Sequence, residues 1–151
     1  EDMQIGMKSE KGWKVKFEHD SSSPSGRSTS KGTLDPSNRG LFAFTEYLPP
    51  AQVCEVNGLS YLWELSFDTG TSTSFAPIGT DSTLTNNGEL ASLPKKPVGS
   101  GQAGEVTFHQ GSGGLTAITN MSTGEITTTA INIGEVGTCR QSWRQIDTSD
   151  F

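Results

Sequence analysis

LFAFTEYLPPAQVCEVNGLSYLWELSFDTG, residues 41–70, is the stretch that decides the fold. It contains two runs dominated by aromatic and aliphatic residues, 41–47 and 61–67, and each has the length and composition of a β-strand. Asn57-Gly58 before the second run and Asp68-Thr69-Gly70 after it are tight-turn sequences. The stretch therefore predicts two strands that are bounded by turns.

Further strand-like runs lie on both sides of this stretch. Residues 13–17, Trp-Lys-Val-Lys-Phe, alternate apolar and basic side chains, as a strand with one buried face does. Apolar residues recur nowhere at helical spacing over three turns. The sequence predicts an all-β, antiparallel domain of about eight to eleven short strands with little or no helix, arranged as propeller-like blades or as a compact β-sandwich. The other expected strands are 105–108, 115–118, 125–133 and 142–146.

The composition also favours short strands joined by many turns. Hydrophobic residues make up 31% of the chain, while Gly contributes 18 residues and Ser, Thr and Asn fill much of the remainder. Three Trp and seven Phe argue against disorder, because they are bulky enough to build a core. We expect one β domain over residues 1–151, with a flexible loop at 21–30 and a low-complexity insertion at 71–104.

The charge pattern narrows the class of partner. The net charge is −6, and the only paired cations, Lys95-Lys96, stand apart from any basic stripe, so nucleic acid and anionic lipid are not expected as partners. No apolar run reaches the length of a membrane span. The chain begins with Glu1-Asp2 in place of Met, which suggests a processed, exported product.

Cys54 and Cys139 are the only cysteines. Their separation excludes a redox Cys-x-x-Cys motif, and two cysteines alone cannot complete a zinc site. We predict one structural disulfide between them, with two buried free thiols as the alternative.

A search for catalytic or metal-binding patterns yields no candidate residue. His19 and His109 lack a partner at ligand spacing, and no Asp-x-Asp-x-Asp run or Gly-x-Ser-x-Gly elbow occurs. Residues 99–104 match the dinucleotide pattern G-x-G-x-x-G, but no strand-to-helix context surrounds them, so a flexible loop is expected there. Glu64 is expected on a solvent-facing side of its strand. The sequence therefore predicts a protein without enzymatic activity, bound metal or cofactor.

Two features bear on ligands and modification. The aromatic residues are expected to build the core, with a sugar-stacking platform on an exposed sheet as the alternative. Asn120-Met121-Ser122 matches the N-glycosylation sequon, which makes Asn120 a candidate glycosylation site. The aromatic set is Trp13, Trp63, Trp143, Phe42, Phe44 and Phe67.

The order of the motifs along the chain resembles a known family. The motifs are Gly12-Trp13, Gly26-Arg27, 41–45, 49–54, 60–65, 68–70, 123–126 and 140–145. This ordered set is similar to the C-terminal β-propeller region of PilY-type type IV pilus tip-associated adhesins and biogenesis factors. The resemblance assigns structural roles within the motifs to Gly12, Trp13, Asp68, Thr69, Gly70, Ser142, Trp143 and Arg144.

The resemblance implies a non-enzymatic, extracellular component of a bacterial type IV pilus system, acting in tip adhesion or pilus assembly. Its expected partners are pilins or minor pilins, a second chain that completes the fold, and a host or surface receptor. The chain departs from the family in length, since 151 residues supply about three propeller blades where four to eight are usual. A globular companion subunit docked on a separate short helical pilin is therefore a second version. A free-standing extracellular carbohydrate-binding β-sandwich is the alternative from another class.

Overall fold

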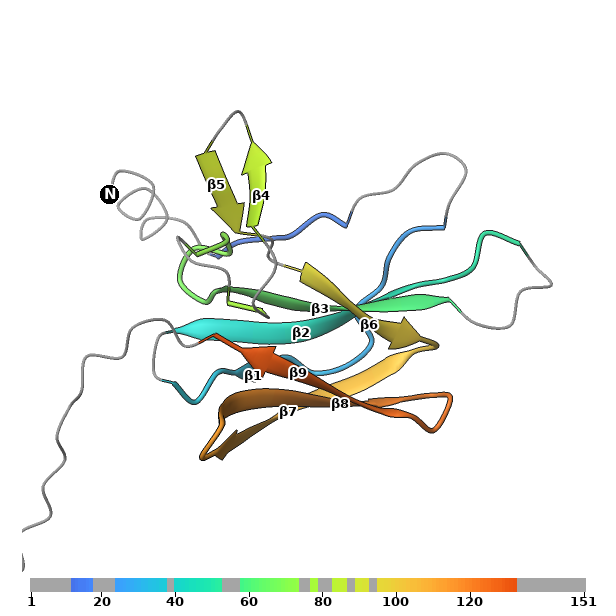
Figure 1. Cartoon of the computed structure of the whole chain (residues 1–151). Helices are drawn as coiled ribbons and strands as arrows, with labels where there is room; N and C mark the ends of the chain where they lie inside the picture. The colour runs from blue at the N-terminus through green and yellow to red at the C-terminus, as the bar shows by residue number, and fades with distance from the viewer. Residues whose placement is uncertain are drawn as a thin grey trace, which may run out of the picture.

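The computed structural model describes residues 12–17, 24–37, 40–52, 58–73, 77–78, 83–86, 89–92 and 95–132. Within these ranges every regular element is a strand, which confirms the all-β prediction (Figure 1). The strands are β1 (Thr33–Leu34), β2 (Leu41–Leu48), β3 (Leu59–Ser66), β4 (Thr83–Asn86), β5 (Glu89–Ser92), β6 (Lys95–Ser100), β7 (Ala103–Gly111), β8 (Gly114–Met121) and β9 (Ile126–Ile131).

The first sheet is antiparallel and has the strand order β1-β2-β3-β6. Its centre is the β2–β3 pair, formed by the two strands that residues 41–70 predict, in unbroken register from Leu41 opposite Ser66 to Leu48 opposite Leu59. The predicted turn at 68–70 follows β3, where the Gly70 N–H donates to the carbonyl of Ser66 over 2.8 Å. Strand β6 covers the other edge of β3 and follows it with a bulge between Ser60 and Tyr61.

The second sheet is an antiparallel meander with the order β7-β8-β9. Its β8–β9 turn is formed by Ser122-Thr123-Gly124, with Gly124 at φ 87° and its N–H donating to the Met121 carbonyl over 2.9 Å. Ile78 forms a bridge with Ile131 at the end of β9. The two sheets pack face to face, as in a compact β-sandwich (Figure 1).

The central core between the sheets is mostly small and aliphatic. Alternation turns one row of side chains inward from β2, β3 and β6 of the first sheet and from β7, β8 and β9 of the second, and these rows meet. Polar side chains of the first sheet bond to the backbone of the second: Thr45 Oγ1 donates to the Gly104 carbonyl over 3.2 Å, and Thr33 Oγ1 to the Val106 carbonyl over 3.0 Å. The core residues are Ala43, Leu62, Ile78, Val98, Ala103, Val106, Leu115, Ala117, Met121 and Ile131, with Phe108 packed against them.

The chain passes from one sheet to the other at a tight corner, which corrects the flexible loop expected at 99–104. Residues 99–100 end β6 and residues 103–104 begin β7. Ser60 stabilises this corner with two hydrogen bonds. Its Oγ donates to the Gly101 carbonyl over 2.7 Å and accepts from the Ala103 N–H over 2.9 Å. Gly101 has φ 91°, a conformation that glycine adopts readily.

Three other segments differ in detail from the expected strands and loops. Residues 12–17 are extended, with Trp13, Val15 and Phe17 half-buried as the alternation predicts, but they form no strand ladder with any described residue. Residues 24–30 lie along β2, where Arg27 and Tyr47 exchange backbone hydrogen bonds of 2.9 and 2.7 Å. Strands β4, β5 and β6 lie inside the stretch 71–104.

Candidate functional site

The outer face of the first sheet carries a second, aromatic core. Pairing in β2 and β3 places Phe44 opposite Trp63 on this face, and their rings stack with centroids 5.9 Å apart and planes 7° apart. Phe17 of the extended segment packs on both rings, at centroid distances of 6.3 and 5.9 Å. Trp63 is therefore buried rather than presented on an open face, as the core interpretation of the aromatics predicts.

This aromatic core brings two of the resemblance motifs together. The Trp13 Nε1–H donates to the Phe67 carbonyl over 2.6 Å, and the indole lies against the backbone of Gly70. A Cβ at Gly70 would overlap the indole, and Gly70 also has φ 66°, so glycine is required there for two reasons. Asp68 is exposed, while Thr69 is buried and its Oγ1 lies 2.7 Å from Thr71 Oγ1.

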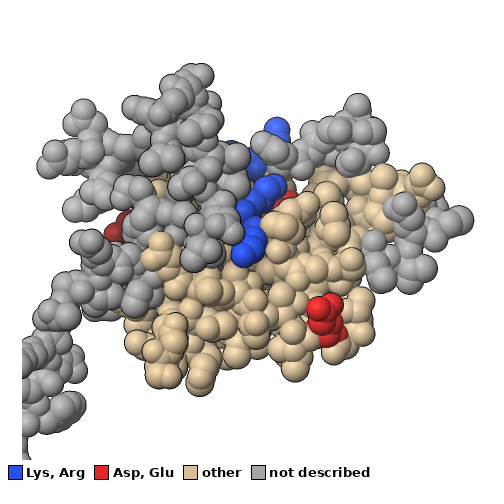
Figure 2. Space-filling view, in the orientation of Figure 1, with Lys and Arg blue, Asp and Glu red and all other residues tan. Residues whose placement is uncertain are grey.

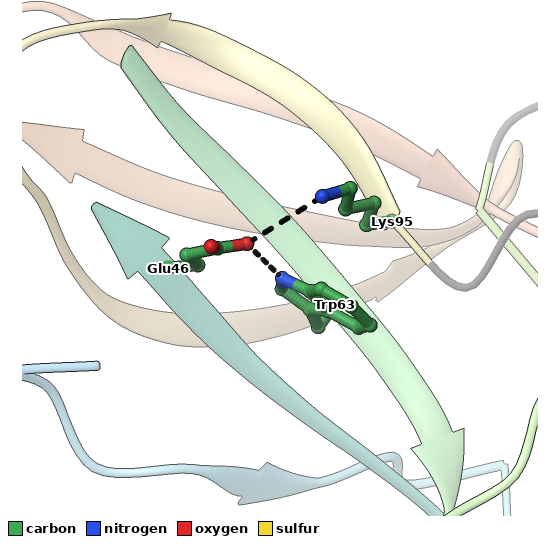
Figure 3. A network of polar contacts seen from close by, with 3 residues as sticks. All are labelled: Glu46, Trp63 and Lys95. Atoms are coloured by element: carbon green, nitrogen blue, oxygen red, sulfur yellow. Dashed lines mark hydrogen bonds and ion pairs between the residues drawn. The ribbon is translucent and has the colours of Figure 1, made fainter. Parts of the chain in front are cut away.

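A polar network is buried beside these rings (Figure 3). The Trp63 Nε1–H donates to Glu46 Oε2 over 2.7 Å, and Lys95 Nζ lies 3.9 Å from the same oxygen. Lys95 Nζ also lies 5.0 Å from the ring centroid of Tyr61 and 5.1 Å from that of Trp63, which is cation–π distance. Gly26 is packed so closely on Glu46 that a Cβ would overlap Oε1. The carboxylate is thus compensated by an indole donor and a lysine, as a buried charge requires.

Sequence reasoning missed this network. Glu46 is spaced two and four residues from Phe44 and Phe42, so alternation places all three on one face of β2. That spacing was the signal in the sequence that the Glu46 carboxylate lies on the aromatic face. Lys95 could not be paired with it from the sequence, because the contact depends on how β6 adds to the edge of β3.

The expected solvent exposure of Glu64 is wrong. Glu64 is fully buried and lies opposite Ala43 on the inner face of the first sheet. Residues 12–17 cover the outer face of β3 and the second sheet covers the inner one, so the middle of this strand has no solvent side. Alternation within β3 predicts one buried face, and it cannot show that the other face is also packed against another element.

Glu64 is paired with another buried acid, Asp35, which follows β1. No described group completes a hydrogen bond to either carboxyl oxygen of Glu64 or to Asp35 Oδ2. Burial, together with the charge of the nearby Asp35 carboxyl and its hydrogen bond to the protonated form, raises the pKa of Glu64 from 4.5 to about 9. Glu64 is therefore a neutral carboxylic acid at pH 7.

The outer face of the second sheet is open and almost uncharged. Between Pro97 and Asn132 the sequence has no Lys, Arg or Asp, and its only acids are Glu105 and Glu125. In Figure 2 the surface formed by β7 to β9 accordingly shows one acidic group and no basic one, while basic side chains gather near the start of β6. In-register pairing places the outward side chains in rows across the strands: Thr107, Ile118 and Thr128; His109, Thr116 and Ala130; Asn120 and Ile126.

The remaining sequence-predicted residues fall into two groups. Asn120 is exposed in β8 and His109 is exposed in β7, beyond the strand end expected for it. Gly12 is exposed at φ 135° beside Trp13. His19, Cys54, Cys139, Ser142, Trp143 and Arg144 lie outside the described residues.

The described residues contain no group of three or more side chains able to hold a metal ion. None of the described elements is a helix long and apolar enough to cross a membrane. No protein-family model, curated protein or solved structure matches the chain. The resemblance to PilY-type proteins therefore stays a prediction from the motifs.

Proposed function

We propose that the chain is a non-catalytic, extracellular component of a type IV pilus system that docks on other pilus subunits. The docking surface is the outer face of the β7–β9 sheet. The observation that carries this proposal is the absence of Lys, Arg and Asp between residues 97 and 132, in a chain with 11 Lys and Arg and 17 Asp and Glu. Depletion of charge is the compositional mark of the core of a protein–protein interface.

The side chains on this face suit a packed contact. Thr107, Ile118 and Thr128 form one row across three paired strands, and β-branched side chains lose little rotamer freedom when a partner covers them. Ile126, which is 65% exposed, adds a large apolar side chain to this face. Glu105 in β7 and Glu125 in the turn before β9 supply polar positions at its margin, as the rim of an interface does.

The edge of this sheet offers a second mode of contact. Among the described residues, β9 pairs with β8 on one side, and the one backbone bridge on its other side joins Ile131 to Ile78. Residues 126–130 can therefore accept an extended strand from another subunit by β-augmentation. The same contacts would serve a tip component or a companion subunit that coats a short helical pilin.

A photocrosslinking experiment tests this proposal. A p-benzoylphenylalanine replaces Thr128 on the proposed face or, as the control, Lys14, which is exposed on the segment that covers the opposite sheet. In the protein's own cells we expect the Thr128 probe, and not the Lys14 probe, to cross-link to a pilin or minor pilin. Cross-links to no pilus subunit would overturn the proposal, and cross-links to glycan alone would favour a carbohydrate-binding module.

A matched pair of substitutions tests the face itself. Thr128→Lys places a charge in the middle of the face, whereas Thr123→Lys places the same charge in the exposed β8–β9 turn. We expect Thr128→Lys to lower co-isolation with pilus subunits by at least about tenfold and Thr123→Lys to leave it nearly unchanged. Equal effects of the two variants would exclude this face as the docking surface.

A further inference from the structure

Asp35 holds the end of β1 in place through three backbone groups. Its own N–H donates to the Leu41 carbonyl over 2.9 Å, which closes the connection from β1 to β2. Its Oδ1 accepts from the Ser37 N–H over 2.6 Å, which fixes the following turn. Its remaining oxygen, Oδ2, is buried without a hydrogen-bond partner among the described groups.

Glu64 is the buried carboxyl that interacts with Asp35. Both of its carboxyl oxygens are buried and have no completed hydrogen bond to a described group, and the side chain has no exposed surface. Two buried carboxyls that act on each other are compatible only if one of them keeps its proton, because two negative charges would otherwise share a site of low polarity. A protonated Glu64 then becomes a donor and Asp35 Oδ2 becomes its acceptor.

Among the described residues, no other charged group lies next to the pair to compensate its ionised form. The residues next to Glu64 on the inner faces of β2 and β3 are Leu41, Ala43, Thr45, Leu62 and Ser66, and none is titratable. Tyr47 lies at the far end of β2, and Lys96 of β6, opposite Leu62, is exposed to solvent. The inner faces of β7, β8 and β9 contribute apolar side chains and threonines.

We propose that Glu64 and Asp35 share one proton and form a pH-sensitive latch that holds residues 33–37 on the edge of β2. While Glu64 keeps its proton, its hydroxyl donates to Asp35 Oδ2 and the latch is closed. When base removes that proton to solvent, two carboxylates are left in the interior and residues 33–37 separate from β2. The edge of β2 that β1 covers, at Phe42 and Ala43, then becomes available to another strand. This inference does not depend on the identity of the docking partner.

Carboxyl NMR on the full chain, labelled with ¹³C at Glu Cδ and Asp Cγ, tests the latch. In the wild type we expect the Glu64 and Asp35 signals to titrate together, with an upper step near pH 9. The methyl signals of Leu34 and Val106 should move with the same midpoint, because Thr33 joins β1 to Val106 of β7. The Ala117 methyl, in the core of the second sheet, should stay unchanged.

Two variants distinguish the effect of Asp35 on the titration of Glu64 from the effect of burial alone. Asp35→Asn removes the like charge, so we expect the Glu64 step to move to lower pH while it remains above the ordinary range of glutamate. Glu64→Gln should abolish the alkaline movement of Leu34, whereas Glu125→Gln, at an exposed turn, should not.

Three outcomes would overturn the latch. The first is a Glu64 signal that titrates at about pH 4–5 with the exposed glutamates. The second is a Glu64 step that Asp35→Asn leaves in place, and the third is an alkaline step in which Ala117 moves together with Leu34, since that is global unfolding. If Glu64→Gln does not fold, the wild type and Asp35→Asn still decide the question.

Discussion

Single residues in this protein are fixed by contacts from distant parts of the chain. Gly70 must adopt a positive φ to turn the chain after β3, and it must also leave room for the indole of Trp13. Gly26 has no such backbone requirement, but Glu46 is packed against it so closely that any side chain would displace the carboxylate. In both positions the requirement for glycine comes from a tertiary neighbour, which the local sequence does not reveal.

Substitution of Gly70 tests how much the indole of Trp13 adds to the cost of placing a side chain at this position. We expect Gly70→Ala to lower the free energy of unfolding by about 2–4 kcal/mol, because both the positive φ and the indole overlap oppose a Cβ. Gly124→Ala is the matched control, since Gly124 has φ 87° but nothing within 4 Å of an added Cβ, and we expect a loss of about 1 kcal/mol. Urea denaturation of the two variants gives the comparison, and equal losses would contradict a steric role for Trp13.

Glu64 gives the protein a stability that depends on pH. The folded state holds this proton up to a pKa of about 9, whereas the unfolded state releases it near 4.5, so between these values the folded state binds more protons. Stability from this group is therefore complete below pH 4.5 and falls as the pH rises, by about 1.4 kcal/mol per pH unit inside the window.

Glu64→Gln removes that dependence. As the pH rises from 5.5 to 8.5, we expect the unfolding free energy of the wild type to fall relative to that of Glu64→Gln. Urea denaturation at each pH measures both free energies. Glu125→Gln, at an exposed position, should show no such trend. A difference that stays constant with pH would contradict a buried, protonated Glu64.

A strand of this fold can be predicted from the sequence where its own residues favour the conformation that it has in the folded molecule. Strands β2 and β3 are predictable because their aromatic and aliphatic runs end at clear turn residues. Strand β6, with the sequence KKPVGS, contains a proline and a glycine and has too little apolar pattern to be found. It is a strand because the edge of β3 offers a ladder to pair with, and that edge becomes visible only in the folded molecule.

The extended segment 12–17 is an element that forms no ladder with the described strands but completes a core. Phe17 covers both Phe44 and Trp63, so we expect Phe17→Ala to lower the unfolding free energy by about 2 kcal/mol, less than for a fully buried Phe. The same variant should shift tryptophan fluorescence to longer wavelength, because Trp63 gains solvent. Lys16→Ala, exposed on the same segment, should change stability by less than about 0.5 kcal/mol. An unchanged emission spectrum in Phe17→Ala would show that this segment does not shield Trp63.

At the scale of the whole molecule, the sequence predicts the class of fold better than the location of its cores. Low hydrophobic content, frequent glycine and strand alternation are enough to predict an all-β chain. Aromatic residues such as Phe44 and Trp63, however, build the outer core of one sheet, while the central core is built mostly from small aliphatic residues such as Ala43 and Ala117. Which face of a strand is buried depends on the elements that pack against it. For β3, segments distant in sequence pack against both faces.

The predicted Cys54–Cys139 disulfide is also a property of the whole chain. We expect the intact mass of unreduced, alkylated protein to show no alkylated cysteine, and reduction followed by alkylation to label both. Reduction should lower the midpoint of thermal unfolding, because a bond between distant residues restricts the unfolded chain. Ready labelling of both thiols in native, unreduced protein would favour the alternative of free cysteines.

The nonlocal ties of the first sheet set an order of assembly. The β7–β8–β9 meander needs only neighbouring segments and short turns, so its folding is expected to be fast. The first sheet is complete only when β6 joins β3, and the aromatic core only when Trp13 reaches Phe67 across 54 positions. On the ribosome, residues 12–17 emerge before β3 and have no surface to pack against until β3 has been synthesised. During that interval Trp13 and Phe17 are exposed apolar residues on a nascent chain, which a chaperone can bind.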